Sequence, residues 1–329
     1  MNAIQRPRRE VRRGCRDSCI FIRARTAILH TRENEITNLL QYSVNNRIIG
    51  STYSCEFFYP GCFRQRRKDR DHMATILQAE NCSRTFKGLV AVKQFSAKLE
   101  EGNIYGLIGT NGAGKTTVIN MLSGVLAPTS GKILYKGTDI TDWKPDRVAK
   151  AGILRTYQNL RLFNKMTVLE NVVIGAQMHR GYSFADGLLH TKRYSENEQK
   201  YREKAMAMLR EVRLESYADV QAASLPYGSQ RRLEIARILA ADPKLILLDE
   251  PAAGMNPQES AELVQMIRHV QETYHLTVLL IEHDMKVIMN LCSYIYAMAQ
   301  GEVIAEGTPE QIRSDPKVIT AYLGRRAHV

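Results

Sequence analysis

The stretch NIYGLIGTNGAGKTTVINMLSGV, residues 103–125, decides the fold of this chain. Its apolar start, Ile104 to Ile108, predicts a buried strand, and the residues from Lys115 onward predict a helix. Residues 109–116 match the loop pattern GxxxxGK followed by Ser or Thr, whose glycines let backbone N–H groups surround phosphate oxygens. Strand, loop and helix follow in the order that this pattern requires, so the sequence predicts a nucleotide-binding site.

Each residue of this phosphate loop has an expected task. Lys115 should reach the β and γ phosphates, and the hydroxyl of Thr116 should bind Mg²⁺. The other residues expected to bind the phosphates are Gly109, Thr110, Asn111, Gly112, Ala113, Gly114 and Thr117. A chance match explains the pattern poorly, because Gly makes up only about 7% of residues on average and the flanking strand and helix must also be present.

A second apolar run, Leu245 to Leu248, is typical of a central parallel strand and ends in two acids, Asp249 and Glu250. Sheets of this class place their ligands at the carboxyl ends of their strands. We therefore expect Asp249 to bind Mg²⁺ through water, and Glu250 to orient or deprotonate the attacking water.

A third predicted strand, Thr277 to Ile281, brings His283 to the same sheet edge. A single His after a strand is usually a surface residue. Here it is the third polar group at one edge, so we expect it to contact the γ-phosphate. Gln158, in the stretch GILRTYQNLRLF, gives a weaker signal by itself, because a Gln in a loop is usually only solvated.

The stretch LPYGSQRRLEIAR, residues 225–237, places turn-forming residues directly before a helical segment. The amino end of a helix carries free backbone N–H groups and the positive end of the helix dipole. This stretch therefore predicts a binding site for an anion, which the stretch alone does not identify.

Local patterns predict further helices. Four apolar residues lie at helical spacing beside a charged face, which predicts an amphipathic helix: Met206, Leu209, Val212 and Leu214. Two capping boxes predict helix starts elsewhere, and they pair Thr167 with Glu170 and Thr308 with Gln311.

A set of features, in chain order, resembles the nucleotide-binding subunits of ABC transporters: Phe86, GTNGAGKTT, Gln158, LPYGSQ, LILLDE, AAGMN and His283. Together they cover roughly residues 73–324, and the ordered set is highly specific. The resemblance implies an α/β fold of the P-loop NTPase class, with a RecA-like core, an antiparallel β subdomain around residues 76–99 and a helical subdomain at about 159–241. It also implies ATP and Mg²⁺ as cofactors.

The resemblance assigns roles to several residues. It implies that Phe86 stacks on adenine, that Gln158 senses the metal and the membrane subunit, and that Glu250 is the catalytic base. It also implies a head-to-tail dimer with two ATP molecules between the subunits. The anion expected at residues 225–237 is then the γ-phosphate of ATP held by the opposite subunit, contacted by Tyr227, Gly228, Ser229 and Gln230.

The signature of this family usually reads LSGGQ, and this chain departs from it. Pro226 replaces the serine whose hydroxyl would contact the phosphate, and proline offers no N–H. Tyr227 stands in place of a common glycine, and Ser229 in place of the usual glutamine. The remaining donors are the Gly228 backbone, the Ser229 hydroxyl and the helix dipole, so we expect weaker binding in trans than with a standard signature.

Longer stretches narrow the resemblance to the ATP-binding subunit of bacterial branched-chain amino acid uptake systems: RTYQNLRLFNKMTVLENV, YGSQRRLEIAR, LDEPAAGMNPQE, IEHDMK and GTPEQIRSDPKVITAYLG. This resemblance implies leucine, isoleucine, valine or related amino acids as cargo. It implies two membrane permease subunits, a paralogous or identical ATPase subunit and a periplasmic or extracellular solute-binding protein as partners, and a peripheral position on the cytoplasmic face of the bacterial inner membrane. Systems for urea or amide uptake and for lipopolysaccharide export share parts of the pattern and stay open as alternatives.

A soluble ABC protein that acts on DNA or ribosomes is a competing function. Such proteins usually carry two cassettes in tandem or a coiled coil that splits one, whereas this chain has one contiguous cassette. The net charge of +12 would favour nucleic acid, but residues 1–72 hold 15 of the 46 Lys and Arg and 7 of the 34 Asp and Glu, which leaves +4 for the rest. We therefore expect no nucleic-acid partner. A protein that only binds nucleotide is disfavoured as well, because Lys115, Asp249, Glu250 and His283 are all present.

Residues 1–72 do not read as a domain, because they show no sustained helical or strand periodicity. A start codon assigned too far upstream would explain them, since Met73 begins a clean strand-like run. A disordered basic arm and an Arg-rich targeting segment are alternatives, and the acidic residues of the segment argue against targeting. Residues 325–329 are expected to form a short tail.

Four of the six cysteines lie in that first segment: Cys15, Cys19, Cys55 and Cys62. Their spacings match no common zinc finger, so a zinc site is a weak alternative there. Cys82 and Cys292 lie far apart in the sequence and are expected to be free thiols. The sequence contains no run of about 18 uncharged apolar residues, the length that a membrane-spanning helix needs.

Overall fold

The structure is a computed structural model that describes residues 74–179 and 181–323. These residues belong to the second of two compact units of the chain, residues 68–329. The expectations for residues 1–72, including the zinc alternative, and for the tail at 325–329 lie outside the described residues. No helix in the described part combines the length and the apolar character that a membrane span needs.

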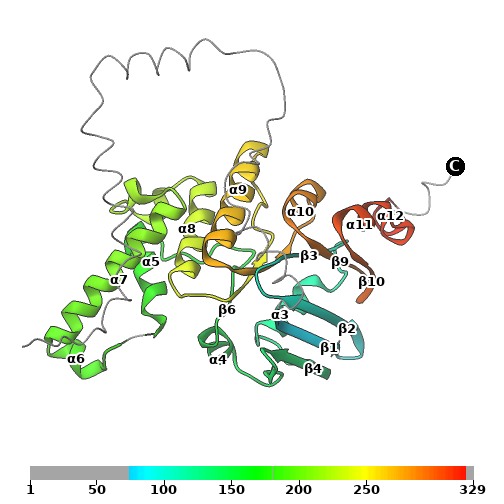
Figure 1. Ribbon diagram of the computed structural model, residues 1–329, viewed down its shortest axis with the longest axis horizontal. Helices are drawn as coiled ribbons and strands as arrows, with labels where there is room; N and C mark the ends of the chain where they lie inside the picture. Colours follow the sequence, from blue (N-terminus) through cyan, green and yellow to red (C-terminus); the bar gives the residue numbers. More distant parts are fainter. Residues whose placement is uncertain (1–73, 180, 324–329) are drawn as a thin grey trace, which may run out of the picture. The chain divides into compact units, whose positions relative to one another are not determined.

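Two sheets carry the fold of the described residues (Figure 1). The larger sheet has the strand order β10-β9-β3-β8-β7-β6, in which neighbouring strands from β9 to β6 run parallel. Its strands are β3 (Ile104–Gly109), β6 (Ile153–Arg155), β7 (Leu245–Asp249), β8 (Thr277–Ile281), β9 (Tyr294–Ala299) and β10 (Glu302–Gly307). The smaller sheet is antiparallel, in the order β2-β1-β4-β5. Its strands are β1 (Thr75–Phe86), β2 (Leu89–Glu100), β4 (Ser130–Tyr135) and β5 (Thr138–Asp139).

The parallel strands are buried on both faces because their sequences are apolar without interruption. In β7, Ile246 and Leu248 face one hydrophobic core, while Leu245 and Leu247 face the other. Strands β3 and β8 alternate in the same way, as the two-residue period of a strand requires. One core contains residues of the helices between β6 and β7, and the other contains residues of the antiparallel sheet. The larger sheet therefore lies between two packed layers.

Figure 1 shows α5, α6, α7 and α8 gathered beside β6, away from the antiparallel strands. These helices are α5 (Val168–Ala176), α6 (Phe184–Leu188), α7 (Lys192–Glu211) and α8 (Tyr227–Leu239). The remaining helices are α3 (Lys115–Leu122), α4 (Pro145–Lys150), α9 (Pro257–Tyr274), α10 (Met285–Leu291), α11 (Pro309–Ser314) and α12 (Pro316–Leu323). The α/β core, the antiparallel sheet and the helical insert have the expected architecture, while the exact bounds 159–241 of the helical subdomain stay a prediction.

The predicted apolar stripe of α7 is partly wrong. Leu209 is buried on the helix as expected, but the other buried residues of α7 are Ala205 and Met208. The helix ends at Glu211, because the next residue but one, Arg213, has a left-handed backbone with φ 57°. Val212 and Leu214 are buried beyond the helix end, and Met206 is only half-buried. The helical spacing of the apolar residues therefore does not continue past the turn at Arg213.

Both predicted capping boxes are confirmed. The Thr167 side chain accepts from the backbone N–H of Glu170, whose carboxylate accepts from the backbone N–H of Thr167. Thr308 and Gln311 form the same reciprocal pair at the start of α11. Each box satisfies backbone donors that a helix start would otherwise leave without partners.

Candidate nucleotide site

The carboxyl ends of three neighbouring strands form the candidate site. In the sheet register, Leu107 of β3 and Asp249 of β7 both align with Ile281 of β8. The phosphate loop continues from β3, Glu250 follows β7, and His283 comes two residues after β8. The topology therefore brings the three predicted groups to one sheet edge, where sheets of this kind bind ligands.

The phosphate loop requires glycine at two tightly packed positions. Gly114 has a left-handed backbone with φ 100°, and a Cβ there would lie 2.7 Å from the carbonyl oxygen of Ala91. At Gly109, a Cβ would lie 2.5 Å from the carbonyl oxygen of Met298. Gly114 is also the residue before α3, so the loop leads directly into a helix whose amino-terminal N–H groups are available to an anion.

Lys115 lies across the loop. Its Nζ donates to the carbonyl oxygens of Gly109, at 2.7 Å, and Thr110, at 3.1 Å. The side chain is buried, and burial lowers the pKa of Lys115, while the charges of Glu250 and Asp249 raise it. The ammonium is therefore held against the loop, close enough to both carboxylates for their charges to raise its pKa. From there it can donate to phosphate oxygens.

Asp249 is a buried carboxylate at the end of β7, with 3% of its surface exposed. Burial raises the pKa of Asp249, and the guanidinium of Arg155 opposes this shift. Arg155 Nη2 lies 3.5 Å from Asp249 Oδ2, and the backbone N–H of Asp249 donates to the Thr156 hydroxyl. The backbone of Asp249 is thus held at the end of β7, and its carboxylate lies beside Arg155.

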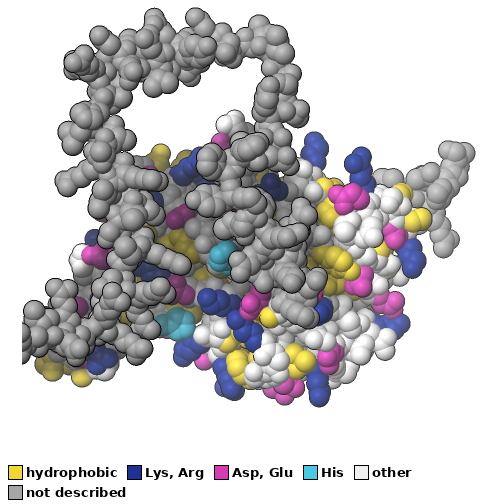
Figure 2. Space-filling view, viewed as in Figure 1, with side chains coloured by type: hydrophobic (Ala, Val, Ile, Leu, Met, Phe, Trp, Pro, Cys, Tyr) yellow, Lys and Arg dark blue, Asp and Glu magenta, His cyan; other side chains and the backbone are white. Residues whose placement is uncertain are grey.

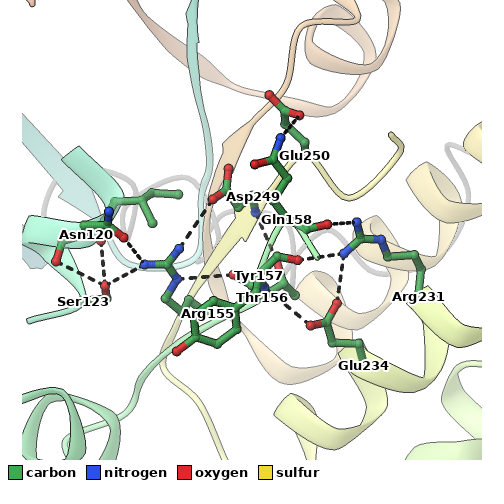
Figure 3. A network of polar contacts seen from close by, with 11 residues as sticks. Asn120, Ser123, Arg155, Thr156, Tyr157, Gln158, Arg231, Glu234, Asp249 and Glu250 are labelled. Carbon is green, nitrogen blue, oxygen red and sulfur yellow. Dashed lines mark hydrogen bonds and ion pairs between the residues drawn. The ribbon is translucent and has the colours of Figure 1, made fainter. Parts of the chain in front are cut away.

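Glu250 is the point where the other predicted residues converge. Its Oε2 accepts from Gln158 Nε2 at 3.1 Å, and its Oε1 lies 3.9 Å from His283 Nδ1 (Figure 3 shows the Gln158 contact). Glu250 also has a left-handed backbone, with φ 48°, a conformation that is uncommon for a residue with a side chain and often marks a functional site. The structure therefore brings Gln158, the weakest prediction, directly to the expected base.

Sequence reasoning missed three charged residues at this edge. Glu282 is buried after β8 and accepts from the backbone N–H groups of Ala252, at 2.8 Å, and His283, at 3.2 Å. Burial raises the pKa of Glu282. An acid directly after a buried strand was the signal used for Asp249, and the same signal was present here. The other two, Arg155 and Arg231, lie inside stretches quoted for other residues, and nothing in their spacing marks them.

Phe86 lies at the end of β1 and is 41% exposed, so it is not an ordinary core aromatic. The Arg84 guanidinium lies 4.9 Å from its ring centroid. Phe86 pairs with Leu89 across the β1–β2 hairpin, and β2 carries Ala91, the residue that touches Gly114 of the loop. The hairpin thus offers an accessible ring on the strand pair beside the phosphate loop, while stacking on adenine stays a prediction.

The predicted anion site is the amino end of α8. Pro226 is the N-cap residue and makes no side-chain capping bond. The Ser229 hydroxyl is buried and accepts from Arg232 Nη2 at 3.0 Å, and Gln230 Nε2 donates to the Leu225 carbonyl at 2.9 Å. Contact with a phosphate in trans stays a prediction for these residues. The Ser229 oxygen accepts from Arg232, so its O–H stays available to donate to a phosphate oxygen.

Two family models match the chain. The model described as ABC transporter matches residues 92–253, and the one described as Branched-chain amino acid ATP-binding cassette transporter matches residues 302–328. The high-affinity branched-chain amino acid transport ATP-binding protein BraF of Pseudomonas aeruginosa is 44% identical over 249 residues, which are 76% of this chain and 98% of BraF. LivG of Escherichia coli K12, of the same description, is 42% identical over 249 residues and the same shares of both chains.

Solved structures are similar over the same part of the chain. The crystal structure of the ADP conformation of MJ1267, an ATP-binding cassette of an ABC transporter, has a TM-score of 0.67 and 33% identity, and the match covers 76% of this chain and 99% of MJ1267. A dimeric structure of the ATP-binding cassette MJ0796, bound to ADP and Pi, has a TM-score of 0.61 and 25% identity, with 71% of this chain and 99% of that chain covered.

Proposed function

Because this chain belongs to the ABC transporter family, as one of its branched-chain amino acid transport ATP-binding proteins, we propose that it drives uptake of leucine, isoleucine, valine or related amino acids. Members of this family bind ATP and are ATPases coupled to transport, so the predicted fold, ATP binding and ATPase activity are confirmed for this chain. The cargo, the metal and the membrane partners belong to the proposal.

The observation that supports the ATPase chemistry of the proposal is that Gln158 and His283 both lie against Glu250. A carboxylate that faces Gln158 and His283 beside the phosphate loop fits a base acting on water near the γ-phosphate. Lys115 would hold the β and γ phosphates, His283 would contact the γ-phosphate, and Glu250 would orient the attacking water or accept its proton. Phe86 would hold the adenine ring.

Magnesium fits the donor set at this edge. Thr116 is exposed at the loop and offers a hydroxyl, and Asp249 offers a buried carboxylate, both oxygen donors that Mg²⁺ prefers. We propose that these two residues hold the ion, with Gln158 close to it. When bound, Mg²⁺ would neutralise charge on the phosphates.

The proposed assembly contains two membrane permease subunits, a second ATPase subunit that is identical or paralogous, and an external solute-binding protein, at the cytoplasmic face of the membrane. The two ATPase subunits would pair head to tail, so that α8 of each meets ATP on the other. The dimeric form of the similar cassette MJ0796 supports the pairing of two ATPase subunits.

A nucleic-acid function is the second candidate, and the face drawn in Figure 2 does not favour it. On the described side chains visible in Figure 2, Lys and Arg are interspersed with Asp and Glu rather than forming a continuous basic band. Binding to a nucleic-acid backbone usually needs such a band. Urea, amide or lipopolysaccharide transport is decided by the permeases, so the experiment below has to separate these cargoes.

The test of the cargo is reconstitution. The full chain, its two permease subunits, its ATPase partner and the solute-binding protein are placed in vesicles, and phosphate release is measured with ATP and Mg²⁺. We expect leucine, isoleucine or valine, added on the side of the solute-binding protein, to stimulate hydrolysis. Arginine, urea, acetamide and lipopolysaccharide should leave it at the basal rate. Stimulation by urea or acetamide alone would contradict the branched-chain cargo but not the transport ATPase.

Pro226→Ser is expected to strengthen ATP-dependent dimerisation. The serine hydroxyl could donate to the phosphate held by the opposite subunit, and a hydrogen bond to a charged group contributes about 1.5–3 kcal/mol, or at least about tenfold in the dimer dissociation constant. Dimerisation is measured by analytical ultracentrifugation with ATP, in a background that does not hydrolyse it.

The matched control for this prediction is Pro226→Ala. Serine at an N-cap also stabilises its own helix by about 1 kcal/mol, and alanine does not cap, so the melting temperatures of both variants report that separate effect. Equal dimerisation of the serine variant, the alanine variant and the wild type would show that the side chain at this position does not matter.

A further inference from the structure

The segment that carries Gln158 is held by a buried arginine of α8. Arg231 is 2% exposed, and its Nη1 donates to the Tyr157 carbonyl at 2.9 Å. Its Nη2 donates to the Gln158 carbonyl, as Figure 3 shows. The same Nη2 also donates to the Tyr227 hydroxyl. One guanidinium therefore binds two consecutive backbone carbonyls, those of Tyr157 and Gln158, and also the first residue of α8.

Glu234, one turn further along α8, binds both Arg231 and the backbone of Tyr157. It is 1% exposed, its Oε2 lies 3.1 Å from Arg231 Nη1, and its Oε1 accepts from the Tyr157 N–H at 3.4 Å. The pair thus binds both backbone groups of Tyr157 and the carbonyl of Gln158. A shift of this segment along α8 would break several of these bonds together, so the segment and the helix are expected to move as one body.

The other side of the same segment is fixed to the nucleotide site. Arg155 donates to Asn120 Oδ1 at 2.6 Å and to the Ser123 hydroxyl at 3.2 Å, both on or just after α3, and pairs with Asp249 (Figure 3). The Thr156 N–H donates to the Leu247 carbonyl of β7. Residues 155–158 therefore form a continuous bridge of contacts from the phosphate-loop helix and Asp249 to α8.

Stability alone is a poor reason for this arrangement. Replacing a buried ion pair by apolar residues is often neutral or stabilising, because both charges lose their hydration. Arg231 Nε is buried and has no hydrogen-bond partner among the described residues, which adds a further cost. What a planar guanidinium provides is a fixed geometry, with donors aimed at two carbonyls at once.

We propose that Arg231, together with Glu234, is a positioning residue that couples Gln158 in one ATP site to the amino end of α8, which acts at the other ATP site. The inference rests on the proposed head-to-tail dimer. Nucleotide binding that shifts Gln158 in one subunit would move its backbone segment. Because Arg231 holds that segment and Tyr227, the movement changes how α8 presents Gly228 and Ser229 to ATP on the opposite subunit.

The test is Arg231→Lys in the full chain. Lysine keeps the charge beside Glu234 but cannot bind two carbonyls with a planar fork. We expect unchanged ATP affinity of the monomer, measured by titration at low protein concentration. ATP-dependent dimerisation should weaken by about tenfold, the effect of roughly one lost charge-assisted hydrogen bond. We expect the dependence of hydrolysis on ATP concentration to be sigmoidal in the wild type and hyperbolic in this variant.

Lys204→Gln is the matched control. It removes an ion pair of the helical region, between Lys204 and Asp242, that does not touch residues 155–158. We expect this variant to keep both the dimerisation and the sigmoidal dependence. Equal losses in both variants would mean that any weakening of the helical region has this effect, and would overturn the proposal.

Two further outcomes separate this inference from the proposed function. If Arg231→Lys dimerises like the wild type and keeps sigmoidal hydrolysis, the proposed coupling is overturned. Hyperbolic hydrolysis by the wild-type protein would overturn it too. Neither result contradicts the function as a transport ATPase. Absence of ATP-dependent dimerisation in the wild type would instead contradict the proposed dimer.

If Arg231→Lys does not fold, as judged by circular dichroism, Glu234→Gln decides. It removes the carboxylate that orients the Arg231 guanidinium toward the two carbonyls, so the coupling should weaken, and fully wild-type cooperativity there would overturn the proposal.

Discussion

Glu250→Gln is expected to bind ATP normally and to lower steady-state hydrolysis by a factor of about 10²–10⁴, the usual contribution of a positioned general base. Glutamine has the shape of glutamate, so its side-chain oxygen can still accept from Gln158 Nε2, as the carboxylate does at 3.1 Å. The amide cannot accept a proton from water at neutral pH. The bound nucleotide therefore stays intact, and the dimer that closes around it should accumulate.

The measurements for this variant are phosphate release, ATP titration and size-exclusion chromatography with ATP and Mg²⁺. Glu101→Gln is the matched control, because Glu101 is a surface carboxylate paired with Lys136 at 3.0 Å, and it lies before β3, at the opposite edge of the sheet from the site. We expect that variant to hydrolyse ATP at the wild-type rate. A wild-type rate in Glu250→Gln would show that another group is the base.

The fold was predictable where one short stretch determines the structure. Strand β8 spans Thr277–Ile281, as its apolar run predicts, and α3 begins at Lys115, where the loop pattern places it. The capping box of Thr167 needs only residues within one turn of each other, so it too was readable. The apolar stripe of α7 failed because a left-handed residue, Arg213, ended the helix within the predicted stripe.

The candidate site was predictable in its residue types but not in its contacts. Asp249 and Glu250 were found because acids at the end of a buried strand are unusual. The partners of Arg231 lie 73 and 74 residues away in sequence, at Gln158 and Tyr157, and only the packing of α8 against that segment brings them together. The bond from Arg232 to the Ser229 hydroxyl likewise depends on the rotamer of one side chain.

The ion pair of Arg155 and Asp249 was not predicted from the sequence, and it bears on whether Asp249 can bind Mg²⁺. A buried carboxylate expected to hold Mg²⁺ already has a cation 3.5 Å away. That contact is long for a charge-assisted hydrogen bond, so the pairing is loose and leaves lone pairs of the carboxylate available. Arg155 is therefore better understood as a residue that opposes the rise of the Asp249 pKa caused by burial than as a competitor for its oxygens.

Lys115→Ala is expected to lower ATP affinity by about 10²-fold or more, because two charge-assisted hydrogen bonds to phosphate oxygens contribute about 1.5–3 kcal/mol each. Folding should change little. The Lys115 ammonium bonds to the carbonyls of Gly109 and Thr110, but burial lowers its pKa, which means that the folded protein bears a desolvation cost for this charge. Alanine removes the bonds and the cost together.

Isothermal titration with ATP and Mg²⁺ measures the affinity, and thermal melting without nucleotide measures the fold. Lys93→Ala is the matched control, since Lys93 is an exposed lysine that pairs with Glu302 at 2.6 Å on the surface and loses only that pair. Its affinity for ATP should equal that of the wild type.

ATP should also raise the melting temperature of the wild type and of Lys93→Ala, because a ligand that binds only the folded state stabilises it. It should raise the melting temperature of Lys115→Ala much less. Unchanged ATP affinity in a folded Lys115→Ala protein would remove the assignment of residues 109–117 as the phosphate site, since no other buried cation in that loop could replace the ammonium.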